Sequence, residues 1–109
     1  SIVFPPHHKS SLLHHMSAFV VSRHAVKDFA AWSAGFKAFD HAALGITSSQ
    51  VGRLETDASV VTIVHTFPAA RLAEVKAAFS SEAFKKIVAD TVPEGSPVSI
   101  EFFSGVEGL

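Results

Sequence analysis

The strongest strand signal in the chain is VVTIVHTF, residues 60–67, which ends at Pro68. β-branched and aromatic side chains fit a pleated sheet, and proline cannot donate the next ladder hydrogen bond. Just before it, residues 46–55 form a second, half-polar strand candidate, and TDAS at 56–59 separates the two. Two adjacent strand segments joined by a short polar turn predict an antiparallel hairpin at the centre of the chain.

One helix and one strand precede this hairpin. Residues 18–24 predict a strand, and residues 28–43 predict a helix because apolar side chains recur every three or four positions. Asp28 can cap the start of the helix, and Gly45 suits the left-handed residue that ends it. The apolar stripe of the helix consists of Phe29, Trp32, Phe36, Phe39 and Ala43.

One helical region and one strand follow the hairpin. The helical region covers residues 69–90 and is interrupted at Ser80, because Ser81 before an acidic residue is typical of a new N-cap. Residues 98–103 predict the last strand. The order β-α-β-β-α-β predicts a ferredoxin-like α+β fold with a four-stranded antiparallel sheet.

Composition limits what this fold can do. The 109 residues suffice for one domain, with 48% apolar residues, 17% charged residues and a formal net charge of −1. The basic residues form no stripe of the kind that binds nucleic acid, and no apolar run is long enough to span a membrane. There is no Cys, and the start lacks the layout of a secretory signal, so we expect a cytoplasmic protein.

The first residues differ from the rest of the chain. Residues 1–15 contain Pro5-Pro6 and two histidine pairs, and we interpret them as a leader or an N-terminal arm. Residues 16–109 form the single domain, for which Met16 would make a natural start. With no fixed carboxylates nearby, we expect no physiological metal site at His7, His8, His14 and His15.

The two faces of the sheet predict a partner. Two helices can cover only one face of a four-stranded sheet, yet the third strand is apolar on both faces. Val61, Ile63 and Phe67 lie on one face, and Val60 and Val64 lie on the other. Exposing such side chains forfeits roughly 1.5–3 kcal/mol each. We therefore expect a homodimer that pairs sheet to sheet.

The chain resembles the dimeric α/β barrel superfamily, and within it the small antibiotic biosynthesis monooxygenase-like proteins. The resemblance spans residues 18–105 and is carried by HAVKDFAAW at 24–32 with Phe36, GITS at 45–48, and residues 60–67. It implies a ferredoxin-like subunit, a homodimer, and a cofactor-independent enzyme acting on an apolar aromatic or polyketide-like compound. Quinol monooxygenases, lactone isomerases and polyketide cyclases all occur in this superfamily.

The absence of two residue types favours a cyclase or isomerase over a monooxygenase. Monooxygenases of this type typically use Asn and often Tyr, and the chain contains neither. It can match only Trp32 and one of Arg23 and Arg53. A cyclase or isomerase that moves a proton with histidine is less affected by these absences. The alternatives are a cofactor-free monooxygenase and a non-catalytic ligand-binding or assembly protein.

Two histidines are the candidate catalytic residues. His65 shares a strand face with Ile63 and Phe67, and an apolar wall would keep its imidazole neutral and able to accept a proton. A structural role as a core histidine with one backbone or Thr partner is the alternative. His24 ends the first strand and would assist, or would only tie the strand to the helix. We expect no cofactor and no metal.

Aromatic residues supply the predicted binding pocket for a small apolar or aromatic ligand. We expect Trp32, Phe36 and Phe103 to wall it, although aromatic stripes also form ordinary cores. We expect Asp40 and His41 to lie at the surface near the end of the first helix, where the helix dipole favours a cation.

Overall fold

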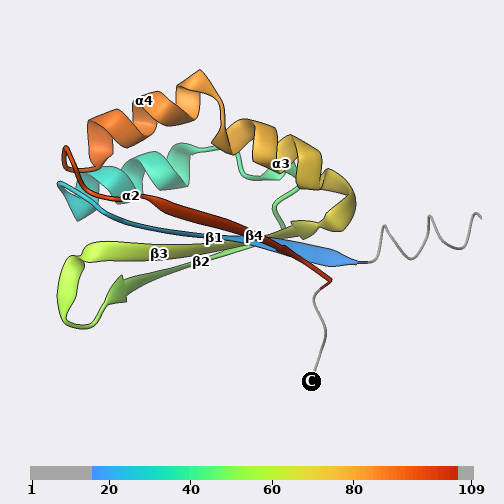
Figure 1. Cartoon of the computed structure of the whole chain (residues 1–109), viewed down its shortest axis with the longest axis horizontal. Helices are drawn as coiled ribbons and strands as arrows, with labels where there is room; N and C mark the ends of the chain where they lie inside the picture. The colour runs from blue at the N-terminus through green and yellow to red at the C-terminus, as the bar shows by residue number, and fades with distance from the viewer. Residues whose placement is uncertain (1–15, 106–109) are drawn as a thin grey trace, which may run out of the picture.

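The computed structural model describes residues 16–105 and shows a four-stranded antiparallel sheet with all helices on one face (Figure 1). The strands are β1 (Ser17–Ala25), β2 (Ser48–Leu54), β3 (Asp57–Pro68) and β4 (Ser99–Ser104). The helices are α2 (Phe29–Ala38), α3 (Leu72–Phe79) and α4 (Glu82–Thr91), with 3₁₀ turns η1 (Ala42–Leu44) and η2 (Ala69–Arg71). The strand order β2-β3-β1-β4 confirms the predicted ferredoxin-like fold.

The predicted helix starts are confirmed by their caps. The Asp28 carboxylate accepts hydrogen bonds from the backbone N–H groups of Ala30 at 3.0 Å and Ala31 at 3.4 Å. The Ser81 hydroxyl accepts from Phe84 N–H at 3.2 Å, so α4 begins as a new helix after α3. Both caps satisfy backbone donors that the first helical turn leaves unpaired.

The predicted end of the first helix is wrong. Helix α2 stops at Ala38 instead of continuing to residue 43, and the chain turns before η1. The Asp40 carboxylate accepts from Ala43 N–H at 3.2 Å and so starts a separate turn. Short polar side chains compete in this way with helix continuation. Gly45 closes that turn with a left-handed φ of 78°, as expected of this glycine.

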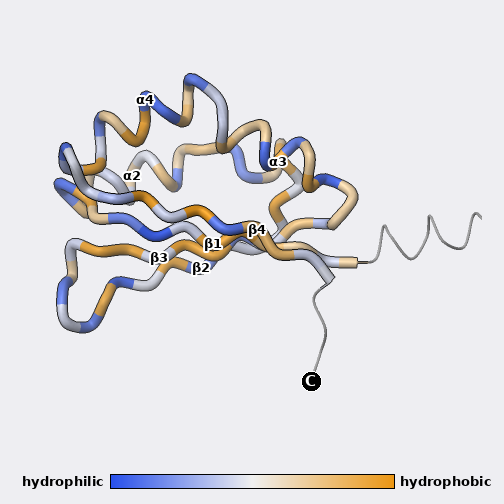
Figure 2. The backbone as a smooth tube through the Cα atoms, in the orientation of Figure 1, coloured by the Kyte–Doolittle hydropathy of each residue, from blue (hydrophilic) through white to orange (hydrophobic). Residues whose placement is uncertain are grey.

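The hairpin turn is tighter than the sequence predicts. It consists of residues 55–56, and β3 already begins at Asp57. At the start of β3 the Asp57 carboxylate accepts from the backbone N–H and the hydroxyl of Ser59. Figure 2 shows apolar residues along most of β3 and polar residues at the β2–β3 turn.

The strands alternate between a helix-covered face and an open face. On the covered side, Val20, Val61 and Phe67 are fully buried. On the open side, Phe19 stacks on Phe103 with ring centroids 4.8 Å apart. The prediction that Phe103 walls the pocket is therefore wrong: its neighbour Phe102 contacts the helices at Phe79, and alternation turns Phe103 to the opposite face.

The covered face carries two separate apolar clusters. The cluster below α3 comprises Ala18, Val20, Ile46, Phe67 and Val75. The cluster below α2 comprises Val26, Trp32, Val61 and Ile63. We call them the α3 cluster and the α2 cluster. Within the described part of the chain, none of the helices has the length and apolar character needed to cross a membrane.

Candidate functional site

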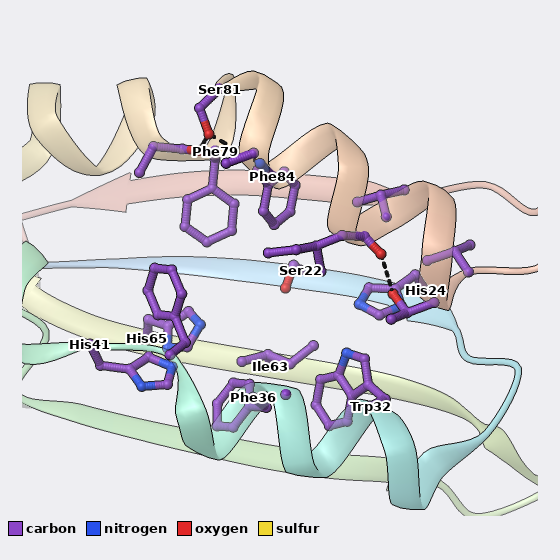
Figure 3. A pocket seen from close by; sticks show the side chains of 18 of the residues that line it. Ser22, His24, Trp32, Phe36, His41, Ile63, His65, Phe79, Ser81 and Phe84 are labelled. Carbon is purple, nitrogen blue, oxygen red and sulfur yellow. Dashed lines mark hydrogen bonds between the residues drawn. The ribbon is translucent and has the colours of Figure 1, made fainter.

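A cavity of about 330 Å³ lies over the covered face of the sheet, between α2 on one side and α3 and α4 on the other (Figure 3). Its volume falls in the range of small-molecule sites. The strands supply the floor with Ser22, His24, Ile63 and His65. The helices supply two aromatic walls, with Trp32 and Phe36 from α2 and Phe79 and Phe84 from α3 and α4.

The aromatic walls follow from local sequence spacing. Trp32 and Phe36 are four residues apart on α2, so their rings stack with centroids 5.2 Å apart. Phe79 ends α3 and Phe84 lies in the first turn of α4, and their rings are 4.9 Å apart across the break between these helices. Aromatic rings on both sides make the space between them mainly apolar, and their faces can stack on a planar ligand.

His65 lies on the floor of this space and is buried, with 6% of its surface exposed. Its Nδ1 atom lies 2.7 Å from the Ser49 hydroxyl oxygen on the neighbouring strand. Phe36 stacks against its ring at 5.6 Å with an angle of 10° between the planes. Burial, with a smaller contribution from repulsion by His41, lowers the pKa of His65 to about 4. The imidazole is therefore neutral at pH 7.

The Nε2 atom of His65 faces the cavity. No described residue makes a hydrogen bond with it, and no fully buried polar side-chain atom among the described residues lacks a partner. Nε2 is therefore partly accessible, and the accessible space is the cavity that His65 lines. A neutral imidazole with one anchored nitrogen and one open nitrogen can exchange a proton with a bound molecule.

His41 is the histidine that the fold brings beside His65. Their ring centroids are 5.2 Å apart, and the His41 ring also lies 4.7 Å from that of Phe36. The expected surface position of His41 is wrong, because α2 ends early and the turn before η1 redirects this side chain into the cavity. The sequence carried no periodic signal for this turn.

His24 lies at the other end of the floor. Its Nδ1–H donates to the Ala25 carbonyl at 3.0 Å, which leaves Nε2 as an acceptor in the neutral ring. His24 pairs with Val61 across the sheet, whereas His65 lies four residues further along β3. Four strand residues span roughly 13 Å, so His24 and His65 do not meet at one ligand atom. Trp32 contacts His24 edge-on, with centroids 6.1 Å apart.

Four of the five predicted site residues line one cavity: His24, Trp32, Phe36 and His65. Phe103 does not, and His41, Ser22 and Ser49 were missed. Strand parity could have found Ser22, because it lies two residues before His24 on β1. Among residues 16–105, no three His, Cys, Asp or Glu side chains gather as a metal site would require. The histidines at 7, 8, 14 and 15, and the proposed arm, lie outside the described residues.

Several solved structures have a fold similar to that of this chain. The chain is similar to a protein of unknown function from Nitrosomonas europaea, with a TM-score of 0.62, 17% identity, and coverage of 88% of this chain and 95% of that one. It is similar to a conserved protein from Methanosarcina mazei, with a TM-score of 0.56, 15% identity and coverage of 84% and 96%. No protein-family model matches the sequence, and no curated protein matches it significantly.

A third similar structure bears on the class of protein. It is "a putative antibiotic biosynthesis monooxygenase" from Caulobacter crescentus, with a TM-score of 0.53, 22% identity, and coverage of 93% of this chain and all of that one. The resemblance to antibiotic biosynthesis monooxygenase-like proteins is thereby confirmed at the level of the fold. The chain is thus a ferredoxin-like α+β protein with an aromatic cavity over one face of its sheet.

Proposed function

We propose that the cavity binds a flat apolar molecule, aromatic or polyketide-like, and that His65 moves a proton on it without a cofactor. The observation that carries this proposal is the buried, neutral imidazole of His65, whose free nitrogen faces a cavity between two aromatic walls. Apolar walls bind the body of such a molecule, and a single acid–base group among them directs the chemistry.

The proposed reaction is a proton shift. His65 Nε2 takes a proton from a carbon next to a ligand carbonyl, and the C–H electron pair passes into an enolate. The resulting imidazolium returns the proton to another ligand carbon, which gives an isomer. In a cyclisation the enolate carbon instead attacks a second carbonyl of the ligand, the C=O π electrons move to that oxygen, and the imidazolium protonates it. Because the pKa of His65 is about 4 in the empty site, its imidazolium readily returns the proton. An adjacent enolate raises that pKa while the ligand carries charge.

Ser49 and His41 support this step from either side of the ring. A hydroxyl can donate or accept, so Ser49 can hold the Nδ1 atom of His65 in both tautomers at 2.7 Å. Nε2 can accept a proton only when the ring carries its own proton on Nδ1, and Nδ1–H then donates to the Ser49 oxygen both before and after Nε2 is protonated. His41, with its ring 5.2 Å away, offers a second acid–base group at the same end of the cavity.

Deuterium exchange tests the proton transfer without knowledge of the natural substrate. The bicyclic aromatic ketone 2-tetralone, in D₂O, exchanges the acidic hydrogens beside its carbonyl, which NMR follows. We expect the protein to accelerate this exchange and His65→Gln to reduce the acceleration by roughly 10²–10⁴-fold. Lys37→Gln, at an exposed position of α2 outside the cavity, should leave the rate unchanged. Equal rates in wild type and His65→Gln would contradict the proposal.

A cofactor-free oxygenation is the second candidate, favoured by the fold shared with the protein from Caulobacter crescentus. There the same carbanion would react with O₂, so that a ligand CH₂ becomes C=O and water is released. Oxygen consumption during turnover distinguishes the two reactions. Binding of the ketone with neither exchange nor oxygen uptake would instead indicate a ligand-binding protein.

The open face of the sheet supports a proposal about assembly. Phe19 and Phe103 stack there, next to the half-buried Val21 and Val64. We propose that two copies pair through this face into a closed barrel, which would cover these side chains. The proposed assembly is therefore a homodimer with one cavity in each subunit, and we propose that it acts in the cytoplasm.

A further inference from the structure

Ser22 lies at the middle of the cavity floor and has an unusual environment for a hydroxyl group. The residue is 5% exposed, and its neighbours in the cavity are mainly apolar. No described residue makes a hydrogen bond with its side chain, yet no fully buried polar atom among them lacks a partner. The hydroxyl therefore reaches the open space of the cavity, and Figure 3 shows it in the gap between the two aromatic walls.

Ser22 also stands between the two histidines that line the floor. His24 follows it by two residues on β1, a distance of roughly 7 Å along the strand. On the neighbouring strand, Ser22 pairs with Ile63, and His65 lies two residues further in the opposite direction. The floor thus has a histidine at each end, His24 and His65, and the Ser22 hydroxyl at the centre. Ile63 lies opposite Ser22 on the neighbouring strand.

We infer that Ser22 is a specificity-determining residue whose hydroxyl binds an oxygen at the middle of an elongated, planar ligand. This inference rests on the proposed function, because it assumes that the cavity binds such a molecule. It adds a chemical class: fused-ring compounds with a carbonyl or hydroxyl group at mid-length. The hydroxyl would donate to a carbonyl and could accept from a ligand hydroxyl.

A buried hydroxyl discriminates because a ligand without a matching oxygen leaves it unpaired. When an apolar ring covers a polar group, the group loses contact with water and gains nothing in return. A hydrogen-bonded pair in the same place gains about 0.5–1.5 kcal/mol. The difference amounts to about 3- to 10-fold in affinity for one neutral hydrogen bond.

Two matched probes test this inference. 9-Fluorenone and fluorene are planar three-ring molecules that differ only at mid-length, where one has C=O and the other CH₂. Trp32 is the only tryptophan of the chain and lines the cavity, so its fluorescence reports the binding of either probe. The quantity to compare between variants is the ratio of the fluorene Kd to the fluorenone Kd, because the difference in solubility between the probes affects this ratio equally in every variant.

Three variants complete the experiment. We expect Ser22→Ala to lower that ratio by about 3- to 10-fold relative to wild type. Ser33→Ala, on α2 outside the cavity, should leave the ratio unchanged. Gly35→Phe should weaken both probes, because Gly35 lines the cavity, a Cβ built there meets no atom within 4 Å, and the phenyl ring would occupy cavity space. Thermal melts establish that each variant is folded.

The possible outcomes separate the two proposals. A ratio that falls in Ser22→Ala alone supports the inference. If both probes bind and Gly35→Phe weakens them, but the ratio is the same in Ser22→Ala, the inference is overturned and the proposed ligand cavity stands. If neither probe changes Trp32 fluorescence at its solubility limit, the proposed binding of flat apolar molecules fails, and the inference fails with it.

Discussion

His65 shows how burial sets the chemistry of one residue. Its ring lies beneath Phe36 and beside His41, and both its burial and its neighbour disfavour a positive charge. The folded protein therefore holds His65 neutral under conditions where an exposed histidine would be partly protonated. That preference links the protonation of this one side chain to the stability of the fold.

The first prediction concerns stability at acidic pH. An unfolded histidine binds a proton below about pH 6.5, whereas folded His65 binds one only near pH 4. Between these values the unfolded state holds more protons, so the free energy of unfolding should fall as pH decreases from about 6.5 to 4. Each pKa unit corresponds to about 1.4 kcal/mol, and solvent screening reduces the effect, so the contribution of His65 is on the order of 1–3 kcal/mol. Urea unfolding across this range should show a shallower pH dependence for His65→Gln, and identical slopes would contradict the pKa direction.

A second prediction at this scale concerns Ser49. Ser49→Ala removes the hydroxyl at 2.7 Å from the Nδ1 atom of His65, so the two neutral tautomers should change in population. The ¹⁵N chemical shifts of the His65 ring report this change, and the rate of 2-tetralone exchange should fall. Ser48→Ala is the matched control, because Ser48 pairs with Thr66 on the open face. If the ¹⁵N shifts of the His65 ring are unchanged in Ser49→Ala, Ser49 does not position this ring.

At the scale of elements, the irregular positions decide which residues meet. The turn pairs Leu54 with Asp57, and regular continuation from there would place Ser49 opposite Thr62. A register shift between Arg53 and Leu54 instead places Ser49 opposite His65. Such a bulge turns a side chain to the other face of the sheet. The contact between Ser49 and His65 therefore depends on one irregularity.

Two glycines provide a matched prediction about local structure. Gly35 lies inside α2 with open space around it, so Gly35→Ala should raise the free energy of unfolding by about 0.5–1 kcal/mol. Gly45 has a φ of 78°, and a Cβ there would lie 3.0 Å from the Arg71 guanidinium. Gly45→Ala should therefore lower the free energy of unfolding by about 1–2 kcal/mol. Thermal or urea unfolding measures both, and equal effects would contradict the assigned turn.

Regular patterns in the sequence predicted most of the fold. Part of the site depends on a helix end and a β-bulge, which no regular pattern predicts. The alternation in residues 60–67 and the spacing of Trp32 and Phe36 correctly placed a strand face and a helical stripe on one cavity. His41 and Ser49 were missed because a helix end and a bulge position them. Both depend on local hydrogen bonds, such as the one from Ala43 N–H to Asp40, that no periodicity reveals.

At the scale of the whole molecule, the sheet is covered on one side only (Figure 1). Phe103 is 42% exposed, although it stacks on Phe19, and the two rings form an apolar patch on the open face. Contiguous apolar patches of this kind commonly mark contact surfaces. A second copy of the same sheet offers the same patch and can cover it by two-fold symmetry.

A substitution on this face tests the proposed homodimer. Val64→Glu places a charge among apolar side chains, so it should convert the dimer to monomers or lower its melting temperature, at a cost of several kcal/mol if the interface buries the charge. Ala34→Glu, at an exposed position of α2, is the control. Light scattering at micromolar concentration measures the mass. A monomeric wild type, or a Val64→Glu variant with unchanged mass and melting, would contradict the proposed interface.

The division of the covered face into an α2 cluster and an α3 cluster has a consequence for cooperativity. The two clusters are connected through β1 and β3, while the cavity lies between the helices above them. Helices that share few apolar contacts can open independently of one another, and amide hydrogen exchange detects such partial opening. A ligand that touches both walls would make α2 and α4 exchange their amide hydrogens as one unit. The empty protein would then consist of two loosely coupled halves, which binding joins into one.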